Sequence, residues 1–129
     1  MQGESSHHRR VSVQQTLPAG CKPDCRGCRH RTLTVVASVA QKQGYLQRVL
    51  QGWGHVLQPV RSVQDDQRFG YRDRVTLNAR WDAAAGWQFG MMRRDELIPI
   101  HDCPVHSARV NTLVALLRAT LPPHAHLPL

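Results

Sequence analysis

The sequence predicts an α+β fold: a small antiparallel sheet of about four strands with two flanking helices. Two observations lead to this class. Short segments of alternating apolar and polar residues in the middle of the chain are separated by links of hairpin length. Segments before and after them space their apolar residues as helices do. Hairpin links join antiparallel strands, whereas parallel strands need long crossovers, so the sheet is expected to be antiparallel.

The two helices are expected at residues 32–51 and after Ser107, which is a candidate N-cap. Gly44 lies inside the first helix and costs about 1 kcal/mol relative to alanine. The apolar positions of the first helix include Leu33, Val36, Ala40, Val49 and Leu50. Those of the second helix follow an i, i+3, i+4, i+7, i+11 spacing and are Val110, Leu113, Val114, Leu117 and Leu121. Pro122 and Pro123 end the second helix.

Four strands are expected between the helices, and the clearest covers residues 71–81. Its apolar face consists of Tyr71, Val75, Leu77, Ala79 and Trp81, and its opposite face of Arg72, Arg74, Thr76, Asn78 and Arg80. This pattern predicts a half-buried strand with a basic exposed face. A short strand is expected before it at 55–60, a partner strand at 87–93 and a last strand at 97–100, where Pro99 indicates a sheet edge or a bulge.

The chain is strongly basic, with 17 Lys+Arg against 9 Asp+Glu in 129 residues and a formal net charge of +8. An excess of positive charge favours a phosphate-bearing partner such as RNA. Only two of the 17 cations are lysines, and codon bias in a GC-rich genome is an alternative explanation for that preference, although not for the net charge.

We expect a cytoplasmic chain without membrane contact, because it has neither a long apolar run nor the apolar core of a signal peptide. Residues 1–18 are expected to be a disordered basic arm, 19–121 the folded domain and 122–129 a short tail.

The four cysteines are the most informative feature of the sequence. Cys21, Cys25 and Cys28 lie in one Gly- and Pro-containing loop, and Cys103 follows after an interval of 74 residues. In a reducing compartment such cysteines are metal ligands or free thiols rather than disulfides. Four thiolates can ligate a 4Fe-4S cluster, with one thiolate for each iron, or a structural zinc ion.

The spacing favours the cluster, since zinc ribbons usually contain two Cys-x2-Cys pairs and only Cys25 and Cys28 are spaced in this way. Unligated cysteines are the remaining alternative. His101 and His106 flank Cys103 and are candidates to replace a thiolate, although hydrogen-bonded or solvent-facing histidines are more common.

Six motifs in order resemble the iron–sulfur central domain of the bacterial SAM-dependent RNA uracil-C5 methyltransferases, which make 5-methyluridine in rRNA and tRNA. The resemblance covers about four-fifths of the chain, from Cys21 to Pro122. The motifs are the Cys21-Cys25-Cys28 loop, Lys42 with Leu46 and Leu50, Gly70-Tyr71-Arg72-Asp73, Phe89-Gly90-Met91, residues 97–102 and Cys103-Pro104. The resemblance implies a structural 4Fe-4S cluster on the four cysteines and an RNA-contacting role.

This chain departs from the family pattern in several places. The first cysteine gap is short, Asp73 replaces a frequent Asn, and Arg94-Asp95-Glu96 stands where Ser-His is frequent. We expect this chain to lack the N-terminal RNA-binding β-barrel common in the family. Methylation of uracil C5 needs a cysteine nucleophile, a base and a domain that binds S-adenosylmethionine. If all four cysteines bind the cluster, no nucleophile remains, and there is no Gly-rich turn to hold the cofactor.

The first hypothesis is therefore a cluster-stabilised RNA-recognition module that works with a separate methyltransferase polypeptide, or derives from a truncated gene. S-adenosylmethionine would be bound only by that separate polypeptide. The candidate phosphate contacts are Lys42, Arg72, Arg74, Arg80, Arg93 and Arg94. The second hypothesis is a zinc-binding structural or protein-interaction domain, and a third is an electron carrier.

Overall fold

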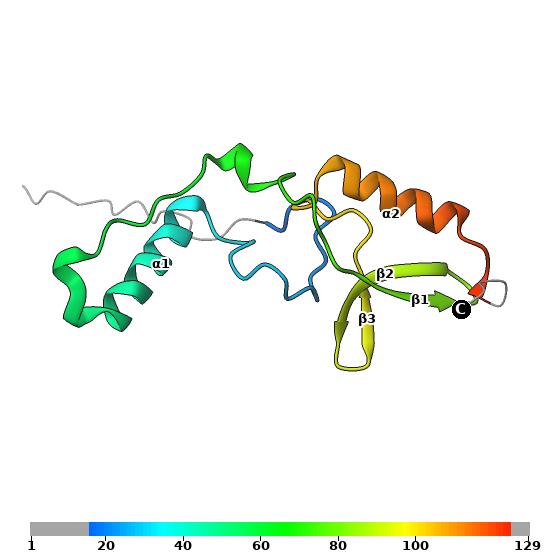
Figure 1. Ribbon diagram of the computed structural model, residues 1–129, viewed down its shortest axis with the longest axis horizontal. Coiled ribbons are helices and arrows are strands. Elements are labelled where there is room, and N and C mark those ends of the chain that lie inside the picture. Colours follow the sequence, from blue (N-terminus) through cyan, green and yellow to red (C-terminus); the bar gives the residue numbers. More distant parts are fainter. Residues whose placement is uncertain (1–15, 125–129) are drawn as a thin grey trace, which may run out of the picture. The chain divides into compact units, whose positions relative to one another are not determined.

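The computed structural model describes residues 16–124, which fall into two compact units (Figure 1). The first unit contains Thr32–Arg61, and the second contains Leu17–Arg31 together with the segment from Ser62 onward. Most of the expected N-terminal arm (1–18) and of the tail (122–129) lies outside the described residues. In the described part of the chain, no helix has the length and apolar character needed to cross a bilayer.

The first unit consists of helix α1 (Val35–Val49) and the 3₁₀ helix η1 (Gln51–Val56). The Thr34 hydroxyl caps α1 by accepting a hydrogen bond from the Ala37 N–H at 3.1 Å, so the helix is present as predicted but begins at Val35, within the expected range 32–51. The strand expected at 55–60 is wrong. The glycine-containing segment 51–56 turns tightly instead, and the Val60 N–H donates to Gln43 Oε1 at 2.7 Å, so this stretch folds back on α1 without pairing to a strand.

Most large apolar side chains of the first unit are exposed. Leu33 is buried, but Val36 is 74% exposed and Val49 59%, so these two do not belong to the core as the spacing predicted. Three further apolar residues of this unit are also exposed: Tyr45, Trp53 and Val56.

The second unit contains a three-stranded antiparallel sheet in the order β1-β2-β3, with β1 at Asn78–Asp82, β2 at Gly86–Arg93 and β3 at Glu96–Pro99. In the first hairpin, Asp82 Oδ1 accepts hydrogen bonds from the N–H groups of Ala84 and Ala85. The second hairpin turns at Arg94, whose φ is 55°. Residues 16–124 form three strands where about four were expected, and β3 lies at the edge, as Pro99 predicts.

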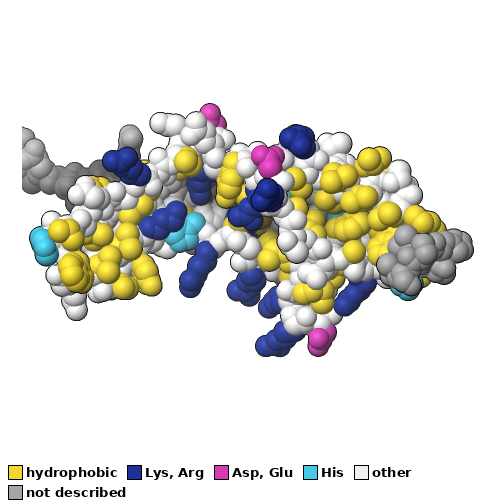
Figure 2. Space-filling view, viewed as in Figure 1, with side chains coloured by type: hydrophobic (Ala, Val, Ile, Leu, Met, Phe, Trp, Pro, Cys, Tyr) yellow, Lys and Arg dark blue, Asp and Glu magenta, His cyan; other side chains and the backbone are white. Residues whose placement is uncertain are grey.

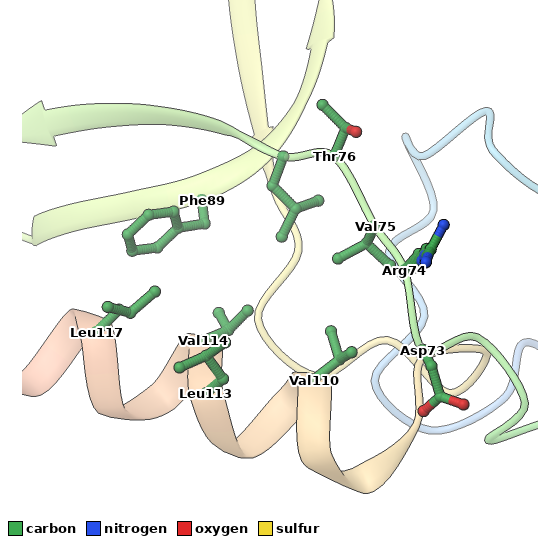
Figure 3. Close-up of a pocket in the computed structure, with 10 residues that line it drawn as sticks. Asp73, Arg74, Val75, Thr76, Phe89, Val110, Leu113, Val114 and Leu117 are labelled. Carbon is green, nitrogen blue, oxygen red and sulfur yellow. The ribbon is translucent and has the colours of Figure 1, made fainter.

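The strand expected at 71–81 begins only at Asn78, where β1 pairs with Gly90 of β2. The preceding residues are extended, with a single parallel bridge between Arg72 and His106. Beyond Gly90, β2 pairs with β3 alone, and residues 73–77 run toward α2 (Figure 3). The predicted strand is therefore wrong upstream of β1, and Tyr71, expected on the apolar face, is 58% exposed. The alternation itself persists at 74–77, where Val75 and Leu77 are half-buried and Arg74 and Thr76 are exposed.

Helix α2 (Ala108–Thr120) packs against β2 and closes the core of the second unit (Figure 1). Ser107 is its N-cap, as predicted, and its hydroxyl accepts from the Val110 N–H at 3.4 Å. Trp87 Nε1 donates to the Pro122 carbonyl oxygen at 2.7 Å, which ties the chain after α2 to the sheet. Leu113 is 53% exposed, so the predicted stripe is only partly buried. Among the described residues of this unit, those that are apolar and buried are Trp87, Ile98, Ile100, Val105 and Val114.

Candidate metal centre and its surroundings

All four cysteines line one small cavity of about 30 Å³ in the second unit. Each is half-buried and none forms a disulfide. The fold thus brings the three loop cysteines and the distant Cys103 to one place. The other lining residues are Pro18, Gly20, Lys22, Arg31, Phe69, Ile100, Pro104 and Val105.

The cysteine loop is shaped by local turns and by one close backbone approach. The Cys21 N–H donates to the Pro18 carbonyl at 3.0 Å, and the Cys25 N–H donates to the Lys22 carbonyl at 3.1 Å. Gly20 has φ +80°, and a Cβ on it would collide with the backbone carbonyl oxygen of Asp102. Because Gly20 precedes Cys21 and Asp102 precedes Cys103, this approach brings the loop beside the fourth cysteine.

The position of Cys103 is fixed by hydrogen bonds to its main chain. Its carbonyl oxygen accepts from the His106 N–H at 3.1 Å and from Asn111 Nδ2 at 3.0 Å. Asn111 lies on α2, so the helix that closes the core also holds the segment bearing the distant cysteine.

Burial and the charges around the cavity shift the pKa values of the cysteine thiols in opposite directions. Burial raises the pKa of Cys21 and of Cys28 above the ordinary value of 9.0, and the neighbouring thiols raise both further. The Arg31 guanidinium lowers the pKa of both thiols, and Arg72 lowers that of Cys28. The Gly27 N–H also donates to Cys25 Sγ at 3.4 Å. Without a bound metal, Cys21 and Cys28 are protonated at neutral pH, so a metal would have to displace their protons.

The four thiols fit the donor chemistry of either a 4Fe-4S cluster or a zinc ion. Within residues 16–124, however, no three His, Cys, Asp or Glu side chains are grouped closely enough to hold a metal ion. The arrangement of the side chains therefore does not show the expected cysteine-ligated centre, and the shared cavity is the structural observation in its favour.

The two histidines beside Cys103 are not among the described residues that line the cavity. His106 is 7% exposed, and burial lowers its pKa, as does Arg72, whereas the neighbouring Asn111 amide raises it. Burial also lowers the pKa of His101. His101 Nε2 and His106 Nδ1 are buried and form no hydrogen bond of ordinary geometry with the described residues.

The six candidate phosphate contacts lie in different places. Lys42 is exposed on α1 in the first unit, whereas Arg93 ends β2 and Arg94 forms the turn after it. Arg80 lines a hollow of about 350 Å³ at the sheet, and its Nη1 donates to the Asp95 carbonyl at 3.1 Å. Figure 2 shows basic side chains gathered around the β2–β3 hairpin on the face that it draws.

Arg74 borders a different hollow, a groove of about 680 Å³ between residues 73–77 and α2. Figure 3 shows Val75, Phe89 and Leu117 directed toward this groove, while Arg74 and Thr76 point away from it. An apolar lining is unsuited to phosphate, so the groove itself is not a candidate for backbone contacts.

Two features near the cysteines were missed by the sequence reasoning. The first is the exposure of Tyr71, which the alternation placed in the core. The second is a group of cations in and beside the cysteine loop: Lys22, Arg26, Arg29 and Arg31. The signal for these cations was present, since a basic residue directly follows Cys21, Cys25 and Cys28.

No protein-family model matches the chain, and no curated protein or solved structure is significantly similar to it.

Proposed function

We propose that this chain is an RNA-recognition module stabilised by a 4Fe-4S cluster on Cys21, Cys25, Cys28 and Cys103, and related to the SAM-dependent RNA uracil-C5 methyltransferases. The observation that carries the proposal is the single cavity lined by four cysteines from two distant parts of the sequence. A cluster there would connect the loop to the segment after the sheet and would stabilise the fold, because metal binding in such domains contributes folding free energy.

The basic character of the second unit supports an RNA partner, rRNA or tRNA. Cations lie directly beside the cysteines and around the β2–β3 hairpin, and the net charge of +8 favours phosphate. Contacts of this kind orient an RNA without reading its sequence. The partner polypeptide would be a separate methyltransferase that supplies the nucleophile and the S-adenosylmethionine site. The reducing cytoplasm is the proposed compartment, since cluster ligation requires free thiols.

A zinc-binding protein-interaction domain is the second candidate. It is favoured by the exposed apolar side chains of the first unit, among them Trp53 at 65% and Tyr45 at 58%. Exposed apolar patches often mark protein contacts. This candidate predicts one zinc ion in the cysteine cavity and no salt-dependent RNA binding.

The RNA role is tested by removing charge from the second unit while sparing the cysteine cavity. Arg74, Arg80 and Arg93 are replaced together by Gln, and Arg72 is kept because its charge acts on Cys28. Removing one phosphate-binding cation lowers the slope of log affinity against log salt by about 0.7 for single-stranded RNA, so the slope of the triple variant should be smaller by about 2. Fluorescence anisotropy with a labelled single-stranded RNA at several salt concentrations measures this slope.

The matched control replaces three exposed arginines outside the candidate set, Arg48, Arg61 and Arg109, by Gln. It removes the same charge and should change the slope by much less. Equal slopes for both triple variants, or a wild-type protein that does not bind RNA, would contradict the proposed function.

A further inference from the structure

Two aromatic side chains at residues 69 and 71 are exposed, and an arginine lies close to each ring. Tyr71 is 58% exposed and Phe69 39%. The Arg72 guanidinium lies 5.9 Å from the centroid of the Tyr71 ring, and that of Arg68 lies 6.0 Å from the Phe69 ring. Phe69 also lines the cysteine cavity, so Tyr71 is the ring that offers more of its surface to a ligand.

The backbone around Tyr71 is held by three hydrogen bonds to the segment that follows Cys103. The Gly70 N–H donates to the Pro104 carbonyl at 2.8 Å and the Arg72 N–H to the Val105 carbonyl at 3.0 Å. The Ser107 N–H donates to the Arg72 carbonyl at 2.9 Å. Val105 and Ser107 are buried, so Tyr71 is exposed on a backbone anchored to the core. A ligand that stacks on this ring would therefore have little backbone left to order.

The chemistry of an exposed tyrosine beside an arginine suits an unpaired nucleobase. Bases stack on aromatic side chains in single-stranded RNA, and an adjacent guanidinium adds cation–π attraction and positive charge for the neighbouring phosphate. Bases in a duplex are already stacked and paired, so they are not available to such a ring.

We propose that Tyr71 is a stacking platform for an unpaired base of single-stranded RNA, with Arg72 beside it. This inference rests on the proposed RNA-binding function and specifies the class of RNA, a loop or other single-stranded segment. It also links the platform to the cysteines, since the segment that anchors Tyr71 begins immediately after Cys103.

The test compares Tyr71→Ala with Tyr71→Phe and with Tyr45→Ala, a control in which an equally exposed tyrosine on α1 is removed. The probes are a labelled single-stranded RNA of ten nucleotides, about the span of one small binding domain, and a duplex of the same sequence. Tyr71→Ala should weaken binding of the single strand by about 5- to 150-fold, with the salt slope unchanged. Tyr71→Phe and Tyr45→Ala should bind as the wild type does, and Tyr71→Ala should not alter duplex binding.

A second measurement does not depend on the folding of a variant. The fluorescence of 2-aminopurine placed in the single strand should be quenched when the wild-type protein binds, because stacking quenches this base. If the wild type binds RNA with the expected salt dependence but Tyr71→Ala is as tight and no quenching occurs, the stacking inference is wrong and the RNA-binding function stands. That result would also leave Tyr71 as a candidate protein contact. If the wild type binds no RNA, both the stacking inference and the proposed RNA-binding function are wrong.

Discussion

Replacing Gly20 by Ala probes the contact that brings the cysteine loop to Cys103. Gly20 adopts φ +80°, a left-handed conformation that costs a residue with a Cβ about 1–2 kcal/mol. The new methyl group would also collide with the Asp102 carbonyl oxygen, and overpacking of this kind costs about 1–3 kcal/mol. The combined loss of about 2–5 kcal/mol is a large part of the stability of a typical domain. At about 4 °C per kcal/mol for a chain of this size, Tm should fall by about 8–20 °C.

Substitutions at two other glycines distinguish the backbone cost from the steric cost in the same thermal-denaturation assay. Gly70 has φ +65° with open space around it, so Gly70→Ala should show only the backbone cost of about 1–2 kcal/mol. Gly52 has open space and no left-handed φ, so Gly52→Ala should change stability by less than about 1 kcal/mol. Only Gly20→Ala should also lower the bound metal. If the Gly20→Ala protein were as stable as Gly70→Ala and kept its full metal content, the close approach of Gly20 to Asp102 would not be what positions the cysteine loop.

Two further predictions concern activity and pH. Purified protein incubated with S-adenosylmethionine and unmodified RNA should form no 5-methyluridine by nucleoside mass spectrometry; turnover that is abolished by mutating one cysteine would show that a nucleophile is present. Burial lowers the pKa of both His101 and His106, so the stabilisation from their neutral rings is complete above the ordinary value of 6.5 and is lost as the pH falls through the lowered values. The free energy of unfolding in urea should therefore drop on acidification below pH 6.5 more in the wild type than in a His101→Gln, His106→Gln double variant, and equal drops would contradict this.

The elements predicted correctly from the sequence are those specified by local signals. The cap at Ser107, the apolar spacing after it and the turn between Asp82 and Gly86 act over a few residues, and α2 and the β1–β2 hairpin form where they indicate. Helix α1 continues through Gly44, as expected, because one such residue costs too little to break a helix of this length.

The predictions that were wrong concern segments whose structure depends on another segment of the chain. Alternation between Tyr71 and Leu77 resembles a strand, but a strand forms only where a neighbour can pair with it, and β2 pairs with β1 no further than Gly90. Exposure of Tyr71 follows from that divergence, so no local pattern could reveal the proposed stacking platform. Val36 and Val49 are exposed for a similar reason, since helical spacing identifies an apolar face but not whether another element covers it.

The cysteine cavity was only partly accessible to sequence reasoning. Spacing identified the four thiols as a set, but the contacts that bring Cys103 to the loop involve Gly20 and Asn111, and neither residue carries a metal-binding signal in the sequence. The influence of Arg72 on Cys28 likewise depends on the fold, because these residues are far apart along the chain.

Metal analysis after oxygen-free purification is the direct test of whether the four cysteines hold one iron–sulfur cluster. Wild-type protein should contain about four iron and four sulfide per chain. Cys103→Ser should lower this content and Tm as much as Cys25→Ser does, because the distant ligand closes the site. One zinc ion with no iron would contradict the cluster in favour of the zinc domain, and a Cys103→Ser protein with full iron and an unchanged Tm would contradict the four-cysteine site itself.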